Sequence, residues 1–345
     1  MNPPPPLPAD DQGWRALMVD ERSAGWRIDA YLARRFPNWS RTTLASHIRD
    51  GTICSEDRRL KPSSTLKLGE RIRLYVPGLA PATPPPPLPP VLYEDDRLIA
   101  FDKPAGLLMH PAGQTWAWAL IGLARQARPG AHMDLVHRLD RETSGAVVLT
   151  KDHEMNAFLK KAFHDHKAHK TYHALVRGVV PWDKQEVSAP MGPALKSEVR
   201  LRQGVRPDGN TARTTFRVLE RLAAHTLIAC HLHTGRTHQI RVHLEHLGFP
   251  LLGDKLYGHG DEVFLAYLED CSAPLVRAAA GFPRQALHAA RLILPLPGGG
   301  ELRLQSPLPP DMAAIVAGEA PCWPDDPHAA LSLEEIAGSG DDSEE

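Results

Sequence analysis

The sequence predicts an α+β protein made of a large module and a small one, with a mainly antiparallel mixed sheet in the large module. The first observation is a proline-rich run at residues 77–90, in which eight of fourteen residues are proline. Proline fixes one backbone angle and lacks an amide donor, so this run favours a stiff extended spacer. The second observation is that strand patterns beyond residue 90 are interspersed with helices without a regular strand–helix–strand rhythm, which is typical of α+β sheets. We therefore expect a disordered tail at 1–19, a small α+β module at 20–76, a linker at 77–90, the large module at 91–310 and an acidic tail at 311–345.

The small module begins with two predicted helices. Apolar residues at helical spacing mark the first one within residues 27–39. The second has Ser40 as its expected N-cap, Leu44 and Ile48 on one face, and Gly51 as its terminator. Residues 52–76 then alternate between apolar and polar positions, which indicates short strands joined by turns.

The large module shows strand and helix patterns along most of its length. Strands alternate with period two, whereas helices place apolar residues three or four positions apart. The expected elements, in chain order, are two strands with an acidic turn within 91–106, a buried strand at 146–150, a helix at 151–166 with Asp152 as N-cap, a strand at 171–180, a hairpin at 214–222 and 225–235, a helix at 236–248 ended by Gly248, and two closing strands at 285–296 and 301–308.

Composition and charge narrow the class of protein. The apolar content of 42% suits a soluble protein with a sizeable core, and no segment has the roughly 20 apolar residues of a membrane helix. The N-terminus lacks the basic start and apolar stretch of a signal peptide, so we expect a cytoplasmic protein whose four scattered cysteines are free thiols. Residues 21–77 carry twelve Lys and Arg against six Asp and Glu, whereas residues 311–345 carry ten Asp and Glu and no Lys or Arg. A basic folded part favours a polyanionic partner such as RNA.

The segment HRLDRETSG, residues 137–145, places the carboxylate of Asp140 between Arg138 and Arg141, just before an apolar run. Nearby positive charge favours an ionised carboxylate. An ionised carboxylate can serve as a nucleophile, a base or an electrostatic stabiliser. The same pattern is also typical of a salt-bridged turn at the surface, so the local sequence leaves both interpretations open.

Eighteen histidines invite a search for a metal site. The groups at 164–169 and 231–246 contain spacings that a metal could use, but no HExxH motif or cysteine pair accompanies them. The sequence also has no glycine-rich phosphate loop and no GxSxG elbow. These observations disfavour a catalytic metal, phosphoryl transfer and serine-hydrolase chemistry.

Residues 137–145 resemble the signature of the RluA family of RNA pseudouridine synthases. Segments 93–111, 170–178 and 233–258 are similar to further motifs of that family in the same order, and 287–289 follows as expected. The small module resembles the S-four-type RNA-binding domain, and the matching positions are 27–29, Leu32, Ser40, Arg41, Ile48, Gly51, Lys61, Pro62 and 68–72. The two resemblances together cover nearly the whole predicted folded chain.

The resemblance implies a pseudouridine synthase fold preceded by an S-four-like RNA-binding domain. It also implies a cofactor-independent isomerase that converts specific uridines of structured RNA into pseudouridine. Large-subunit ribosomal RNA is the first expectation for the substrate, and transfer RNA remains open. A monomer that does not bind membranes is expected.

The resemblance further assigns roles to three catalytic residues. Asp140 aligns with the aspartate that acts on the ribose of a flipped-out uridine, either as a nucleophile or by taking a proton from the sugar. Arg241 aligns with the arginine that pairs with this aspartate. Tyr172 aligns with the tyrosine that packs on the target base.

Other residues are expected to bind the RNA. Arg138 aligns with the residue that fills the gap left by the flipped base, and Leu139 would line the pocket. Lys103 and Arg236 are expected either to anchor the sheet or to bind phosphate. In the small module the expected RNA-binding residues are Arg27, Arg41, Arg49, Arg58, Arg59 and Lys61.

Two other classes of function are weighed against this one. A non-catalytic RNA-binding relic would be favoured by loss of Asp140, Tyr172 or Arg241, and all three are present. A histidine-based metal hydrolase would be distinguished by metal analysis of the purified protein.

Overall fold

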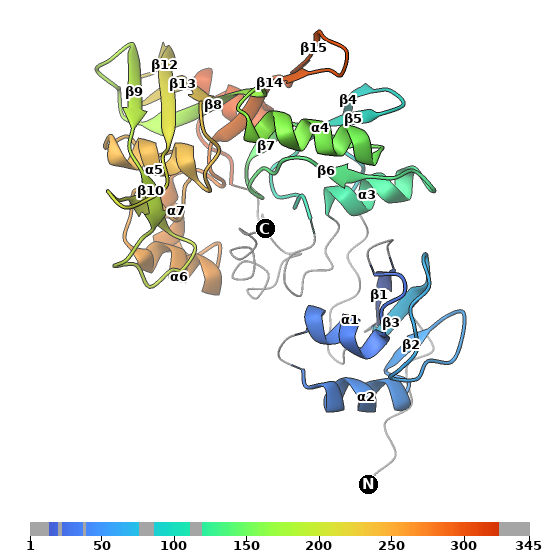
Figure 1. Ribbon diagram of the computed structural model, residues 1–345. Coiled ribbons are helices and arrows are strands. Elements are labelled where there is room, and N and C mark those ends of the chain that lie inside the picture. Colours follow the sequence, from blue (N-terminus) through green and yellow to red (C-terminus); the bar gives the residue numbers. More distant parts are fainter. Residues whose placement is uncertain (1–13, 20–22, 37–38, 76–85, 111–118, 324–345) are drawn as a thin grey trace. The chain divides into compact units, whose positions relative to one another are not determined.

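The computed structural model describes residues 14–19, 23–36, 39–75, 86–110 and 119–323 (Figure 1). These residues fall into a small unit, described over 14–75, and a large unit that begins at residue 87. No helix in these ranges is long and apolar enough to cross a bilayer.

The small unit packs two helices on a three-stranded antiparallel sheet. The helices are α1 (Ile28–Arg35) and α2 (Arg41–Arg49), and the sheet order is β1 (Trp14–Met18), β3 (Arg71–Tyr75), β2 (Ile53–Ser55). The predicted helices are confirmed. The Ser40 hydroxyl accepts a hydrogen bond from the Thr43 amide at 3.0 Å, which caps α2, and Gly51 follows the helix with a φ of 82°. Leu44 and Ile48 are buried in the core of this unit.

Strand β1 corrects the expected disordered tail at 1–19, which is wrong at 14–18. These residues pair with β3 along their whole length, from Trp14 opposite Tyr75 to Met18 opposite Arg71. Leu17 is buried in the core because it shares a face with the apolar residues of the sheet. Residues 1–13 of the expected tail lie outside the described residues.

The large unit contains a ten-stranded mixed sheet whose main path is β4-β5-β7-β14-β8-β13-β12-β9, with β15 paired to β14 and β6 to β7. All strand pairings in it are antiparallel except that of β7 with β14. The strands are β4 (Val91–Glu94), β5 (Leu98–Lys103), β6 (Asp134–Leu135), β7 (Ser144–Thr150), β8 (His169–Arg177), β9 (Lys184–Ser188), β12 (Arg213–Arg221), β13 (His225–Leu232), β14 (Leu287–Pro295) and β15 (Glu301–Gln305). A separate hairpin pairs β10 (Met191–Pro193) with β11 (Gln203–Val205).

The predicted α+β class and the predicted strands and helices of the large module are confirmed. The described helices of this unit are α3 (Leu120–Ala127), α4 (His153–His164), α5 (Gln239–His246), α6 (Asp261–Glu269), α7 (Pro274–Ala280) and α8 (Pro310–Val316). Four of them, α3, α6, α7 and α8, were not predicted. The expected acidic tail at 311–345 is wrong at 311–316, because α8 buries Met312 and Ile315 against the large unit. Residues 76–85 of the expected linker lie outside the described residues, whereas the Pro90 carbonyl already accepts a hydrogen bond from the Asp102 amide.

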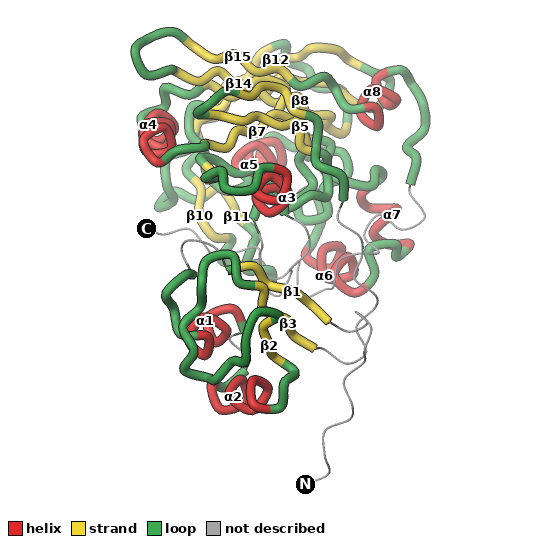
Figure 2. The backbone as a smooth tube through the Cα atoms, turned by 90° about the vertical axis from the view of Figure 1, so that its right-hand side faces the viewer, coloured by secondary structure: helices red, strands yellow, loops and turns green. Residues whose placement is uncertain are grey.

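The two faces of the sheet are covered by different helices. Alternate residues of β5 and β7 pack into separate clusters, one with α3 and α5 and the other with α4. Figure 2 shows α3 and α5 on the same side of the sheet, apart from α4. Strand β7 is therefore buried over its whole length, which explains its unbroken apolar run.

One close approach positions the predicted catalytic segment. Gly145 has a φ of 114°, and a Cβ atom there would lie 2.4 Å from the carbonyl oxygen of Ala289. Only glycine fits because the parallel pairing sets Gly145 opposite Ala289 and Ser144 opposite His288. This contact brings the loop that carries Asp140 against the start of β14.

Candidate active site

Asp140 lies in the loop between β6 and β7. Its carbonyl accepts a hydrogen bond from the Thr143 amide at 3.1 Å, which makes the segment 140–143 a tight turn. The side chain is 36% exposed, so one side of it is held by the protein while the other remains open to a substrate. The structure thus gives Asp140 the partial exposure that a reacting carboxylate needs.

Arg241, on α5, is the cation that pairs with Asp140. Its Nη1 atom donates to Asp140 Oδ2 at 3.1 Å. Its Nε and Nη2 atoms donate to the two oxygens of Asp254 at 2.7 and 2.9 Å. Asp254 is fully buried and also accepts from the amides of Leu256 and Tyr257. The bidentate pair fixes the plane of the guanidinium and so the direction of its bond to Asp140.

The two arginines beside Asp140 in the sequence do not hold it, which corrects the physical reason given for its charge. Arg138 is exposed, and within the described residues its guanidinium has no ion pair or hydrogen bond. Arg141 turns away and donates to the Tyr267 hydroxyl at 2.6 Å. Alternating side-chain directions in this turn send neighbours in the sequence to different surroundings.

The electrostatics of the site keep Asp140 ionised. Burial alone would raise the pKa of this carboxyl, but the His238 imidazole, the Arg241 guanidinium and the hydrogen bond from Gln285 outweigh it, so its pKa lies below the usual range. Burial also lowers the pKa of His238 to about 4, so this imidazole is neutral at pH 7. The charge on Asp140 at neutral pH therefore depends mainly on Arg241 and Gln285.

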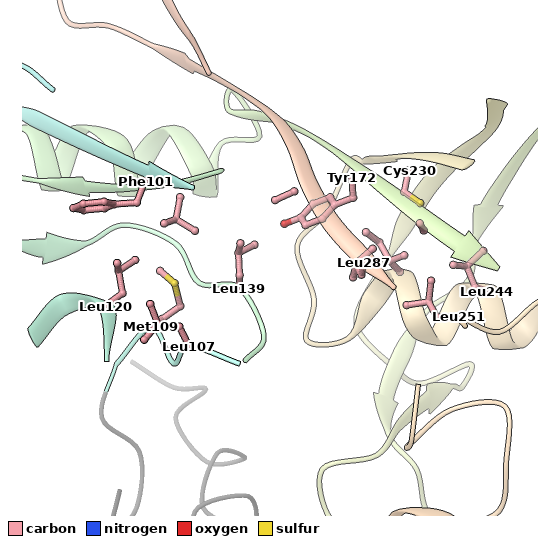
Figure 3. Close-up of a cluster of buried hydrophobic side chains, with 14 of the residues drawn as sticks. Phe101, Leu107, Met109, Leu120, Leu139, Tyr172, Cys230, Leu244, Leu251 and Leu287 are labelled. Atoms are coloured by element: carbon pink, nitrogen blue, oxygen red, sulfur yellow. The ribbon is translucent and has the colours of Figure 1, made fainter. Parts of the chain in front are cut away.

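Tyr172 enters the same region from β8. It is 6% exposed and pairs across the sheet with Cys230. Burial raises the pKa of its hydroxyl, and the nearby charge of Asp140 adds to the effect, so it stays protonated at neutral pH. Figure 3 shows Tyr172 beside Leu287, with its hydroxyl directed toward the side on which Leu139 lies. An aromatic face beside an ionised carboxylate is suited to holding a planar base.

Leu139 is buried beside Leu107 and Met109 (Figure 3). Its side chain is 7% exposed, so the backbone around Asp140 is anchored in the core. Arg138, which precedes Leu139 in the chain, is exposed to solvent. Whether either residue touches RNA stays a prediction.

Of the two roles expected for Lys103, its surroundings favour anchoring the sheet over binding phosphate. Its side chain is fully buried, and Nζ donates to the carbonyls of Pro104, Leu107 and Arg141 at 2.9, 2.8 and 3.1 Å. Burial lowers its pKa to about 7. Since the Arg141 carbonyl belongs to the catalytic turn, Lys103 ties that turn to β5, which is the sheet-anchoring role that the sequence left as one of two alternatives.

Arg236 is exposed just before α5. Its Nε atom donates to the Thr211 carbonyl at 3.1 Å, and its amide donates to Gln239 Oε1 at 3.0 Å. Within the described residues its terminal nitrogens make no further hydrogen bond. The arrangement leaves them available to a phosphate, and that role stays a prediction.

Four residues of the site escaped the sequence analysis. His238 Nε2 lies 3.9 Å from Asp140 Oδ2, and its Nδ1 lies 2.8 Å from the Tyr257 hydroxyl. His238 has a φ of 56°, a left-handed conformation that is uncommon outside glycine and clusters at functional sites. Gln285 donates from Nε2 to Asp140 Oδ2 at 3.2 Å. Asp254 and Tyr257 support Arg241, the latter with its ring 4.8 Å below the guanidinium. No periodicity or spacing in the sequence indicated these contacts.

The basic residues of the small unit divide into two groups. Arg58 donates to both oxygens of buried Glu70 at 2.8 and 2.9 Å, so it is held in a structural ion pair, and its contact with RNA stays a prediction. Arg27 likewise makes a bidentate pair with Asp29, and Arg41 lies 3.9 Å from the same carboxylate.

The remaining three basic residues converge. Arg49, Arg59 and Lys61 are exposed and line one surface hollow beside Ile48 and Leu60. A concave surface with several cations and little competing acid suits a phosphate backbone. Contact of these residues with RNA remains a prediction.

Among the described residues, one group has the donors for a metal ion. It consists of His132, Asp134 and His153, whose candidate ligand atoms all lie within 4.8 Å of one another. His132 Nε2 already lies 3.1 Å from Asp134 Oδ2, and the Arg125 guanidinium lies 4.0 Å from the other oxygen. These residues share no contact with Asp140, Tyr172 or Arg241.

Comparison with known proteins relates this site to one family. The sequence profile of the RNA pseudouridylate synthase family matches residues 97–246, which include Asp140, Tyr172 and Arg241. Ribosomal large subunit pseudouridine synthase D of Xanthomonas campestris pv. campestris is 36% identical over 318 residues, which are 89% of this chain and 93% of that protein. The protein of the same name from Nitrosomonas europaea is 37% identical over 312 residues, 87% of this chain and 86% of that protein. The solved structure of human RNA pseudouridylate synthase domain containing 4 superposes with a TM-score of 0.53 at 26% identity, over 67% of this chain and 94% of that one.

Proposed function

The chain belongs to the RNA pseudouridylate synthase family, and from this premise we propose that it modifies large-subunit ribosomal RNA with Asp140 as the reacting carboxylate. The protein is an enzyme that isomerises uridine in RNA to pseudouridine. The relatives named as ribosomal large subunit enzymes align over most of their own length, which supports the same class of substrate here. Transfer RNA is the other substrate to test. Action in the cytoplasm as a monomer belongs to the same proposal.

The reaction exchanges one bond to the ribose for another. The bond from uracil N1 to C1′ breaks, and a bond from C5 to C1′ forms. The hydrogen on C5 is lost and N1 gains one, so there is no net oxidation or reduction. Asp140 can act in one of two ways: a carboxylate oxygen bonds to C1′ as the uracil anion leaves, or it takes the C2′ proton as the C1′–N1 bond breaks. Both routes need an ionised carboxylate at the sugar.

The observation that carries the proposal is the 3.1 Å pair of Asp140 with Arg241 inside a network that ends on buried Asp254. A carboxylate out of bulk water needs a fixed cation to remain charged. Arg241 supplies that charge from a guanidinium whose orientation is held by the bidentate pair with Asp254. The exposed side of Asp140 would then face the ribose of the substrate.

Tyr172 and Arg138 complete the proposed site. A stacked uridine is inaccessible, so the enzyme flips it out at a cost of a few kcal/mol. The Tyr172 ring would hold the detached base while it turns. The exposed guanidinium of Arg138, which has no partner within the described ranges, would occupy the space that the uridine leaves.

The small unit is proposed to be an S-four-type RNA-binding domain. Its two helices, three-stranded sheet and the hollow lined by Arg49, Arg59 and Lys61 support this assignment. Contacts with the phosphate backbone would add affinity without reading a base sequence. Choice of the uridine would then depend on the shape of the RNA and on loops around the site.

The test uses ribosomal RNA transcribed with tritium at C5 of uracil, because each turnover releases one tritium to solvent. We expect release by the wild type in the presence of a chelator. Asp140→Asn and Asp140→Ala should release none while binding RNA within a few-fold of the wild type. Asp208→Asn is the control, since Asp208 is an exposed aspartate paired with Arg206.

Substantial turnover by either Asp140 variant would show that the reacting carboxylate is a different one. If the wild type released no tritium, the same assay would be repeated with transfer RNA as the substrate. Failure on both RNAs would refute the proposed activity.

A further inference from the structure

Among the described residues, the polar contacts of the Asp140 carboxylate all reach one of its two oxygens. Arg241 Nη1 lies 3.1 Å, Gln285 Nε2 3.2 Å and His238 Nε2 3.9 Å from Oδ2. No described residue donates a hydrogen bond to Oδ1. The carboxylate is thus anchored through Oδ2, and Oδ1 keeps its lone pairs for the substrate.

Gln285 is the second hydrogen-bond donor to Asp140, beside Arg241. It is 2% exposed and precedes β14, where the parallel contact with β7 begins. Its Nε2 atom also donates to the Thr143 hydroxyl at 2.6 Å. Both amide protons are therefore used within the turn 140–143. With the amide reversed, its oxygen would face the carboxylate, so this network defines the orientation of the side chain.

Gln285 is itself held by a buried ion pair. Its backbone amide donates to Glu142 Oε2 at 3.0 Å. Glu142 also accepts from Lys255 Nζ at 2.9 Å to each oxygen and from the Tyr267 hydroxyl at 2.9 Å. Burial would raise the pKa of Glu142, but Lys255 and Arg141 lower it well below its usual range, so it stays ionised. The position of Gln285 is thereby fixed by groups from three segments of the chain.

We propose that Gln285 is a positioning residue for the isomerisation: with Arg241 it fixes Asp140 Oδ2 so that Oδ1 is the oxygen that reacts with the ribose. This inference rests on the proposed function of Asp140. A neutral amide suits the role because it donates a hydrogen bond without adding a second full charge, so Asp140 stays ionised yet reactive. Correct orientation of a reacting group is worth about 100-fold in rate for a displacement of roughly 1 Å.

The first test compares Gln285→Ala with the wild type in the tritium-release assay. We expect kcat to fall about 10-fold to 100-fold while KM changes less than about threefold, because the loss concerns the reacting carboxylate and not RNA binding. Gln185→Ala is the matched control, since Gln185 lies on β9 and its side chain bonds only to the neighbouring Glu186 carbonyl among the described residues. Wild-type kcat in Gln285→Ala would overturn the inference while leaving the proposed function intact.

The second test uses Gln285→Glu. If Gln285 only stabilised the fold, the activity of this variant relative to the wild type would not depend on pH. An ionised glutamate at this position would repel Asp140, whereas a protonated one donates a hydrogen bond in place of the amide. Activity of this variant relative to the wild type should therefore rise as the pH falls from about 8 to about 6. The other titratable groups around Asp140 are Arg241, His238, Tyr172, Tyr257 and Lys103, and they are common to both proteins. An unchanged pH profile relative to the wild type would refute the positioning role.

A third measurement needs no RNA and so separates the inference from the proposed function. The protein is labelled with ¹³C at the aspartate carboxyls, and the Asp140 signal is assigned by its loss in Asp140→Asn. In Gln285→Glu the coupled pair of carboxyls should titrate with one apparent pKa raised into the range from about 5 to 7. The wild type and Gln185→Glu should show no such step at Asp140. Absence of the step in Gln285→Glu would overturn the inference even if the enzyme proved inactive on every RNA tested.

Discussion

At the scale of single residues, Asp140 takes its environment from partners far away in the sequence. Arg241 is 101 residues away and Gln285 is 145 residues away, whereas Arg138 and Arg141 beside it point elsewhere. Arg241 in turn depends on Asp254, which is fully buried. The charge of Asp140 thus depends on Arg241, whose orientation depends in turn on buried Asp254.

Asp254→Asn should therefore lower both the free energy of unfolding and the activity. The substitution leaves the Arg241 guanidinium in the interior with Asp140 alone, and breaking a buried pair in this way costs about 3–5 kcal/mol. We expect that loss in urea denaturation and a fall in kcat, because Arg241 is no longer oriented. Asp208→Asn, in an exposed pair, should cost under about 0.5 kcal/mol. A loss below about 1 kcal/mol for Asp254→Asn would contradict the role given to this pair.

Arg138→Ala should lower activity without lowering the stability of the fold. Arg138 is exposed and has no partner among the described residues, so stability should change by less than about 0.5 kcal/mol. Turnover on structured RNA should nevertheless fall, because no side chain fills the space left by the flipped uridine. The defect should shrink on RNA in which the target uridine is unpaired, since that base costs less to extract. Equal defects on the two RNAs would argue for a simple phosphate contact.

At the scale of elements, the N-terminus of α4 is stabilised both by a local cap and by an ion pair with a distant residue. The α4 helix begins at Asp152, whose carboxylate accepts from the Met155 amide at 2.7 Å as an N-cap. The same carboxylate receives two hydrogen bonds from Arg97 at 2.8 and 3.0 Å. Arg97 precedes β5, so the cap also ties the helix to the sheet.

The charge of Asp152 should make its contribution dependent on pH. The hydrogen bond from Arg97, followed by that from the Met155 amide, lowers the pKa of Asp152 to about 2. Its stabilisation is therefore present above the unfolded pKa of about 3.9 and is lost as the pH falls through about 2. The side chain is 36% exposed, so solvent screening reduces the effect to about 1 kcal/mol.

Asp152→Asn isolates this charge, because asparagine is an equally good N-cap. We expect the variant to be less stable than the wild type by about 1 kcal/mol at pH 7, with the difference shrinking below pH 4. Urea denaturation at several pH values measures it. A difference that stays constant from pH 7 to pH 3 would show that the contribution is not electrostatic.

At the scale of the whole molecule, the proposed catalytic residues and the proposed RNA-binding residues of the hollow fall in different units. The large unit holds Asp140, Tyr172 and Arg241, while the small unit carries Arg49, Arg59 and Lys61 around one hollow. Phosphate contacts release counterions, so they control the salt dependence of binding. Catalysis and salt dependence should therefore respond to different substitutions.

The triple variant Arg49→Ala, Arg59→Ala, Lys61→Ala tests this division. Each lost phosphate contact lowers the slope of log affinity against log salt by about 0.7–0.9, so we expect a decrease of about 2–3 in its magnitude. The rate of tritium release at saturating RNA should stay unchanged. A filter-binding titration at several salt concentrations gives the slope.

The control for this prediction removes the same number of cations from paired sites of the large unit, at Arg206, Arg221 and Arg303, each of which has an acidic partner. Its slope should change less than that of the triple variant. If the slope of log affinity against log salt were equal in the two variants, the proposed RNA-binding role of the hollow would be refuted.

The sequence by itself determined the α+β class, most of the strands, half of the described helices, the caps at Ser40 and Asp152, and the family resemblance of segment 137–145. These features depend on periodicity and on residues a few positions apart, which a sequence displays directly. The elements that it missed include β1 and α8, each of which packs its apolar residues on a distant part of the chain.

Only the tertiary structure decided what holds Asp140 and what Lys103 does. The pairing of β7 with β14 brings segment 140–145 against 285–289, and α5 brings Arg241 to the same point. The burial of Lys103 below the catalytic turn follows from the same packing. Hydrogen bonds of a side chain depend on which segments meet in space, and that information lies in the topology of the sheet, not in the neighbours along the chain.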